Sequence, residues 1–218
     1  MQTIALINYG SGNLRSAEKA LIRAADGNSA VVVTDDPDVI AAADRIVLPG
    51  VGAFAACMAA LKARSGVVEA MTEAVRGKGA PFLGICVGMQ LLASRGLEFG
   101  ETRGLDWIDG DVRKLSAGDD PAIKIPHMGW NSLTDIAEQP MFAGLKPPSG
   151  KTDGQTVYFT HSFAFFPKDA ADVAAYVEHG ERFPAAVARG NIAGVQFHPE
   201  KSQAAGLSLL ARFLEWQP

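Results

Sequence analysis

A short apolar strand runs directly into an apolar helical segment near the middle of this chain. Residues 82–85 are typical of a buried strand, residues 87–93 have a helical pattern, and no loop separates them. Cys86 stands at the junction, with Gly84 and Gly88 two residues away on either side. Such a turn strains the backbone, and glycines remove Cβ atoms where strand and helix crowd each other. The spacing G-x-C-x-G therefore predicts a nucleophile elbow, with the thiolate favoured by a helix N-terminus, over a buried structural cysteine.

The first half of the chain alternates strand-like and helix-like patterns. Short apolar runs occur at residues 4–7, 30–33, 45–48 and 82–85, and helical spacing of apolar residues occurs at 14–25, 54–63 and 67–76. This alternation predicts a parallel sheet covered by helices, that is, an α/β fold. Functional loops in such sheets lie at the carboxyl ends of the strands, where residues 9–13, 49–54 and Cys86 all fall.

The second half is richer in β patterns. Strands are predicted at residues 111–115, 157–166, 173–177, 185–188 and 192–197, and an amphipathic helix at 207–216. Residues 146–154 predict a Pro/Gly-rich surface loop, and residues 125–131 form an unusual cluster of aromatic and polar groups. No linker or repeat interrupts the pattern. We therefore expect one domain over residues 1–218, a mainly parallel sheet flanked by helices and extended by antiparallel strands.

Composition excludes several classes of function. The net charge of −4 gives no basic excess, so neither nucleic acid nor an anionic membrane is an expected partner. Two cysteines do not make a disulfide framework, which favours a reducing compartment. The N-terminus is typical of a first strand rather than a signal peptide, and no run of 18 apolar residues occurs. The expected location is therefore the cytoplasm.

A cysteine nucleophile needs a base, and the base needs a group that orients it. His198 ends the apolar run at residues 194–197, and Glu200 follows two positions later. Residues i and i+2 of an extended segment point to the same side, so Glu200 can hold the His198 ring. This predicts a Cys–His–Glu arrangement. His127 is the second choice of base, and the cysteines are placed too far apart for a zinc site.

Two glycine-containing turns have open interpretations. Gly10-x-Gly12 lies between a strand and a helix, but Arg15 stands where a dinucleotide-binding fingerprint has its third glycine, so a tight turn is favoured. The loop at residues 49–54 is either a helix-entry turn or a loop that turns backbone N–H groups toward an anionic transition state.

The motifs around these residues resemble a known family. Residues 84–90 (GICVGMQ) and 197–200 (FHPE) are similar to the two signatures of class I (triad) glutamine amidotransferases. Residues 8–14, 48–54, 126–131 and 158–162 are similar to the glutaminase subunits of imidazole glycerol phosphate synthases. The resemblance runs from the first strand to the last helix.

The resemblance implies that glutamine is hydrolysed at Cys86, giving glutamate and ammonia. The ammonia would pass to a separate (β/α)₈ cyclase subunit, which makes imidazole glycerol phosphate and an aminoimidazole carboxamide ribotide in histidine biosynthesis. No cofactor or metal is implied. The implied roles beyond the triad are an oxyanion loop (Gly50, Val51, Gly52), glutamine contacts (Gln90, His161, Ser162) and a docking face in loops on the catalytic rim (Asn13, His127, Trp130, Lys201). The glycines of the oxyanion loop also predict a peptide flip that couples turnover to the cyclase.

Three alternatives remain open at this point. One is a triad glutaminase of another synthase, such as that of vitamin B6, against which the cluster at residues 127–131 argues. Another is a cysteine-dependent α/β hydrolase acting on esters or lactones. The third is a non-enzymatic partner protein that has kept the fold.

Overall fold

A computed structural model of the chain describes residues 1–146 and 154–218. Within this part of the chain, seven strands form a central sheet in the order β11-β12-β13-β4-β3-β1-β2. Their bounds are β1 Gln2–Ile7, β2 Ser29–Thr34, β3 Arg45–Gly50, β4 Phe82–Cys86, β11 Val173–His179, β12 Glu181–Arg189 and β13 Ile192–Val195. The strands from β13 to β2 are parallel, and β12 and β11 are added antiparallel at one edge. The predicted fold class, a parallel sheet with antiparallel additions, is confirmed.

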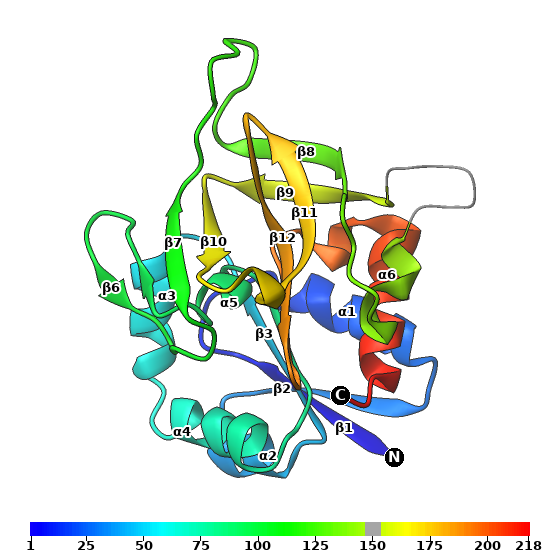
Figure 1. The fold of residues 1–218 in the computed structure, drawn as a ribbon. Helices are drawn as coiled ribbons and strands as arrows, with labels where there is room; N and C mark the ends of the chain where they lie inside the picture. The colour runs from blue at the N-terminus through cyan, green and yellow to red at the C-terminus, as the bar shows by residue number, and fades with distance from the viewer. Residues whose placement is uncertain (147–153) are drawn as a thin grey trace.

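Helices cover both faces of this sheet. Helices α1 (Leu14–Ala25) and α6 (Gln203–Glu215) lie side by side on one face, and α2 (Pro37–Ala42), α3 (Phe54–Lys62) and α4 (Val67–Thr72) lie on the other (Figure 1). Burial on both faces explains why the central strands are nearly continuous apolar runs rather than alternating patterns. No helix in the described residues has both the length and the apolar character needed to cross a bilayer.

Smaller sheets complete the molecule near the carboxyl ends of the central strands. One holds β10 (Phe163–Pro167), β7 (Gly110–Lys114), β5 (Arg95–Gly96) and β6 (Thr102–Arg103), and the other pairs β8 (His127–Ser132) with β9 (Thr156–His161). Single turns occur at Glu73–Gly77 (a π turn), Pro140–Leu145, Ala170–Asp172 and Pro199–Lys201 (3-10 turns). The Tyr158 carbonyl accepts a hydrogen bond from the His198 N–H at 2.9 Å, which joins β9 to the segment after β13.

The helix predicted at residues 87–93 is wrong in length. Helix α5 spans only Val87–Gln90. The carbonyls of residues 91–94, which would continue a helix, instead accept hydrogen bonds from the N–H groups of residues 104–108. A helix of one turn adds little macrodipole, so the thiolate stabilisation expected from it is correspondingly weak.

The single strand predicted at residues 157–166 is also wrong. The chain breaks at Ser162, so that β9 pairs with β8 while β10 pairs with β7 in another sheet. The cluster at residues 125–131 was expected in a loop, but its residues from His127 onward form strand β8. The π turn likewise ends the regular part of the helix predicted at residues 67–76. Most of the surface loop predicted at residues 146–154 lies outside the described residues.

Candidate active site

Cys86 lies at the end of β4 with a backbone conformation that only a constrained turn imposes. Its φ is +54° and its ψ is −112°, which is unusual for a residue with a Cβ atom. A Cβ on Gly84 would lie 2.5 Å from the Gly88 carbonyl oxygen, and one on Gly88 would lie 1.8 Å from the Leu48 carbonyl oxygen. Strand β4, helix α5 and strand β3 therefore meet too closely for side chains at these two positions. The local geometry is that of the predicted elbow.

His198 and Glu200 lie after β13, the parallel neighbour of β4. The Nδ1 atom of His198 lies 2.8 Å from Glu200 Oε1, and both side chains are almost fully buried. Burial lowers the pKa of His198, but the contacts with Cys86 and Glu200 outweigh it and raise the pKa to about 9. The Nε2 atom of His198 is buried and has no hydrogen-bond partner among the described residues. An unpaired imidazole nitrogen is thus available to a neighbouring reactive group.

Cys86 and His198 line one cavity of about 360 Å³, within the usual size range of small-molecule sites. Other residues of its lining are Gln90, His161, Ser162, Val51 and Gly52, all predicted at the site from the sequence. Gln90 and His161 are buried, and a side-chain nitrogen of each lies within hydrogen-bond distance of the Phe163 carbonyl oxygen, at 2.8 and 2.9 Å. The structure therefore brings the predicted nucleophile, base, oxyanion loop and glutamine contacts to one place.

Residues of the turn between β1 and α1 form hydrogen bonds with the end of β3 and the loop that follows it. The Tyr9 hydroxyl donates to the Pro49 carbonyl oxygen at 2.8 Å, and the Ser11 hydroxyl donates to the Val51 carbonyl oxygen at 2.8 Å. The N–H of Val51 donates to Ser11 Oγ at 3.4 Å. Gly52 has φ +97°, which favours glycine. In this structure the Val51 N–H is thus engaged by Ser11.

The four residues predicted on a docking face divide into two groups. Asn13 and Lys201 are exposed, and Trp130 is about half exposed (49%). The rings of Trp130 and Tyr158 meet edge to face, and Lys201 Nζ lies 5.6 Å from the centre of the Tyr158 ring. His127 does not belong with them, because it is only 3% exposed and packs between other rings inside the molecule. Its placement on an exposed rim loop was wrong.

Sequence reasoning missed polar residues at the site, among them Glu98 and Gln196. Glu98 lines the cavity, and its Oε2 accepts a hydrogen bond from the Phe54 N–H at the start of α3 at 2.8 Å. Gln196 is fully buried, and its Nε2 lies 3.7 Å from Cys86 Sγ. Glu98 lies in a polar segment without periodicity, which gave no signal. Gln196 is a polar residue within an apolar strand pattern, and that was a signal.

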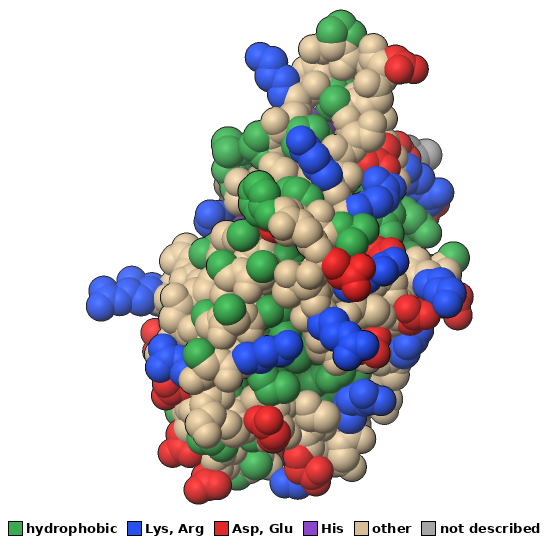
Figure 2. All heavy atoms as spheres, turned by 90° about the vertical axis from the view of Figure 1, so that its left-hand side faces the viewer, with side chains coloured by type: hydrophobic (Ala, Val, Ile, Leu, Met, Phe, Trp, Pro, Cys, Tyr) green, Lys and Arg blue, Asp and Glu red, His purple; other side chains and the backbone are tan. Residues whose placement is uncertain are grey.

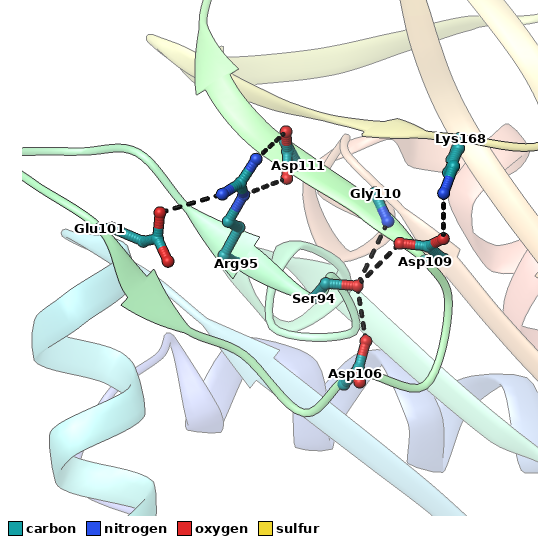
Figure 3. A network of polar contacts seen from close by, with 8 residues as sticks. All are labelled: Ser94, Arg95, Glu101, Asp106, Asp109, Gly110, Asp111 and Lys168. Atoms are coloured by element: carbon teal, nitrogen blue, oxygen red, sulfur yellow. Dashed lines mark hydrogen bonds and ion pairs between the residues drawn. The ribbon is translucent and has the colours of Figure 1, made fainter.

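A larger cavity, about 770 Å³, lies elsewhere, beside β5, β6 and β7. Several of its charged side chains are paired with one another (Figure 3): Arg95 makes a bidentate contact with Asp111 and also contacts Glu101, and Lys168 contacts Asp109. Among the described residues, no cysteine or histidine lines it. The face that carries β6 and α3 likewise intersperses acidic and basic side chains (Figure 2). Chemistry rather than size therefore makes the cavity at Cys86 the candidate active site.

Comparisons with known proteins agree with this geometry. Residues 5–216 match the family described as glutamine amidotransferase class-I. The chain is 59% identical over 221 residues to the imidazole glycerol phosphate synthase subunit HisH of Caulobacter vibrioides, covering 100% of both chains. It is 55% identical to the subunit HisH of Rhodospirillum rubrum, covering 99% of both.

Solved structures similar in fold include a glutamine amidotransferase (TM-score 0.67, 17% identity, 97% of both chains covered). The glutaminase domain of Trypanosoma brucei CTPS with bound acivicin is another (TM-score 0.64, 14% identity, 100% of this chain and 96% of that chain covered). At these identities the likeness concerns the fold alone.

The elbow cysteine at the end of a parallel strand, on a fold shared with glutaminases, defines a class I glutamine amidotransferase. Within that class, the chain belongs to the family of imidazole glycerol phosphate synthase subunits HisH.

Proposed function

We propose that this chain is the glutaminase subunit of an imidazole glycerol phosphate synthase. It would hydrolyse glutamine to glutamate and ammonia and deliver the ammonia to a (β/α)₈ cyclase subunit, in the cytoplasm, for histidine biosynthesis. The observation that carries the proposal is the shared cavity of Cys86 and His198, in which His198 Nε2 is unpaired and Nδ1 contacts Glu200. The identity of 50–59% to proteins named HisH supports it.

The contacts support a definite role for each member of the proposed triad. Glu200 accepts a hydrogen bond from the Nδ1–H of His198, which leaves Nε2 of His198 to take the proton of the Cys86 thiol. The thiolate attacks the carboxamide carbon of glutamine, and the C–N bond breaks as His198 returns the proton to the departing ammonia. Water then cleaves the thioester and releases glutamate. The raised pKa of His198, about 9, favours the protonated imidazole that returns the proton to ammonia.

Other residues of the lining have proposed roles in holding the substrate. Gln90 uses its amide nitrogen within the protein, so its oxygen remains to accept a hydrogen bond from glutamine. Glu98 supplies a carboxylate for the α-ammonium group, and the segment at His161 and Ser162 forms the opposite wall. These assignments place the carboxamide of the substrate toward Cys86.

We also infer that the oxyanion site is incomplete in this conformation. The N–H of Val51 is bonded to Ser11, and so it does not face a developing oxyanion. Rotation of the Gly50–Val51 peptide would break that 3.4 Å contact and turn an N–H toward the cavity. Docking of the cyclase on the face with Asn13, Trp130 and Lys201 would favour the rotation. Val51 is exposed, and it lines the same cavity as Lys201, so a partner on this face would lie next to the loop.

The test is glutamate release by the chain alone, with the cyclase subunit, and with the cyclase plus its nucleotide ligand. Slow release by the chain alone and fast release in the liganded complex are expected. Activation by a vitamin B6 synthase partner instead would identify the other glutaminase, and turnover of esters without glutamine would identify a hydrolase. A chain with no turnover in any combination would reject enzymatic function.

A further inference from the structure

One backbone carbonyl, that of Phe163, is the meeting point of two buried side chains from different elements. His161 Nδ1 lies 2.9 Å from this oxygen and Gln90 Nε2 lies 2.8 Å from it. A carbonyl oxygen only accepts hydrogen bonds, so both nitrogens carry the protons. This fixes the tautomer of His161 and the orientation of the Gln90 amide.

The first branch runs from His161 to strand β8. A neutral His161 that is protonated on Nδ1 must accept at Nε2, which lies 3.2 Å from His127 Nδ1. His127 therefore donates at Nδ1 and accepts at Nε2 from Asn131 Nδ2, also at 3.2 Å. The same nitrogen of Asn131 donates to the Glu178 carbonyl oxygen at 2.8 Å, which independently fixes the orientation of that amide. The two histidines face each other because their residues are paired directly across β8 and β9.

The second branch runs from Gln90 to the nucleophile. The other proton of Gln90 Nε2 is directed at Gln196 Oε1, 3.0 Å away. The oxygen of Gln196 is thereby an acceptor, and its Nε2 donates toward Cys86 Sγ at 3.7 Å. Gln196 does not line the cavity and is fully buried, so it contacts the sulfur from the protein interior rather than from the cavity.

The two branches meet at the Phe163 carbonyl oxygen, which accepts from both sides, and together they form a file of hydrogen-bonded groups: Asn131, His127, His161, the Phe163 carbonyl, Gln90, Gln196 and Cys86. The first branch requires both histidines to be neutral, because a second proton on either ring would place two N–H groups face to face. Burial, with the nearby His161 and His179 rings, lowers the pKa of His127 to about 3. Burial, with the nearby His198 and His179 rings, lowers the pKa of His161 to about 4. Both are neutral at physiological pH, as the file demands.

We propose that this file positions the nucleophile, with Gln196 holding the Cys86 sulfur and His127 acting through His161 and the Phe163 carbonyl to hold Gln196 in place. The proposal rests on the proposed function, since it assigns these residues to the glutaminase reaction. It assigns the buried His127 a positioning role in the reaction, in place of the docking role that was expected for it. It also connects strand β8, which carries the half-exposed Trp130, to the reacting sulfur.

The first experiment replaces Gln196 by methionine, which has a similar shape but no N–H group. The donor to sulfur is lost, so the pH midpoint for alkylation of Cys86 by iodoacetamide should rise, and alkylation at neutral pH should slow about tenfold. Because Gln196 does not line the cavity and Gln90 keeps its bond to the Phe163 carbonyl oxygen, kcat for glutamine in the cyclase complex should fall by a larger factor than KM changes. A purely structural role for Gln196 would leave the pH midpoint unmoved.

The second experiment replaces His127 by phenylalanine, which keeps a ring stacked on Phe159 and His179 but has no N–H group. We expect kcat to fall about three- to tenfold. The matched control is His179→Phe, because His179 stacks on the same ring but bonds the Lys124 carbonyl outside the file. If His127→Phe does not fold, Asn131→Asp replaces it, since Asn131 is only partly buried. The carboxylate introduced by Asn131→Asp has no N–H group to donate a hydrogen bond to His127 Nε2, so kcat should fall by a similar factor.

The double variant His127→Phe/Gln196→Met decides between a connected file and two separate sites. Residues that share no partner usually have multiplicative effects, whereas members of one network do not. We expect the double variant to lose clearly less kcat than the product of the single losses. Folded single variants with unchanged kcat and pH midpoint, or a strictly multiplicative double variant, would overturn the proposal. Wild-type chain that fails to hydrolyse glutamine in the cyclase complex would instead reject the proposed function.

Discussion

The Nδ1 atom of His198 and the Oε1 atom of Glu200 lie 2.8 Å apart, with both side chains nearly excluded from solvent. The contact joins residues two positions apart and leaves the other imidazole nitrogen free in the cavity with Cys86. Replacing His198 by alanine removes both thiol activation and protonation of ammonia, so glutamine turnover should fall about 100- to 10,000-fold. Glu200→Gln should be milder, because an amide oxygen still accepts the hydrogen bond.

These losses are measured as glutamate release in the cyclase complex, with His127→Ala as the comparison. The base assignment would be wrong if His127→Ala were as damaging to basal hydrolysis as His198→Ala, since His127 is expected to act only through its neighbours.

The nucleophile is tested by selective labelling. A diazo-ketone analogue of glutamine should label Cys86 and leave Cys57 untouched, because the Cys57 thiol is buried on α3 and contacts the Val51 carbonyl oxygen at 3.3 Å. Cys86→Ala should abolish glutamine-dependent synthesis while ammonia-dependent synthesis by the cyclase continues. Peptide mapping locates the label. Label on Cys57, or glutaminase activity that survives in Cys86→Ala, contradicts the assignment.

The free energy of unfolding should be greatest near pH 6.5. Below this pH the unfolded chain protonates its histidines, but buried His127 and His161 take up protons only near pH 3 and 4, so stability falls with acidification. Above it, folded His198 keeps its proton to about pH 9 while the unfolded chain releases it, so stability falls with rising pH. Thermal midpoints measured across pH 4–9 should show both slopes. His127→Phe should flatten the acid slope and His198→Asn the alkaline slope, and unchanged slopes would refute the pKa directions.

Gly52 offers a test of the loop after β3. Both Gly52 (φ +97°) and Gly27 (φ +81°) have open space where a Cβ would lie, so alanine at either position meets only backbone strain, of about 1 kcal/mol. Gly52→Ala should reduce activation of glutamine turnover by the liganded cyclase, because the loop has lost conformational freedom beside the cavity. Gly27→Ala should lower stability similarly and leave activation intact. Equal activation ratios in the two variants would remove the loop as the site of coupling.

Trp130 is expected to dominate docking of the cyclase. It is a half-exposed tryptophan next to Tyr158, and such residues are frequent hot spots. Trp130→Ala should weaken the complex at least tenfold, as measured by titration calorimetry, without lowering Tm much. Ile22→Ala is the control, because Ile22 is similarly exposed (53%) but lies on α1. Equal affinities of both variants would place the interface elsewhere.

Several features were determined by the sequence alone because they depend on near neighbours. Helix α1 was predicted with its observed bounds, and the strands of the parallel sheet were predicted to within about two residues at each end, from apolar periodicity. The elbow at Cys86 was predictable because the contact that requires Gly84, with the Gly88 carbonyl, lies within one strand–helix turn. The contact of His198 with Glu200 was predictable from their spacing, since it joins residues two positions apart.

Tertiary structure alone decided the features that depend on strand pairing. Ser162 separates two strands because the residues before it pair with β8 and those after it with β7, and a local pattern contains no record of distant partners. His127 is buried because β8 pairs with β9 and the His179 ring covers it, although its own neighbours in sequence are exposed or glycine. Gln196 reaches the sulfur of Cys86 because β13 lies parallel to β4 in the register that sets Val195 beside Ile85. That register is set by the packing of both sheet faces together, which no segment encodes by itself.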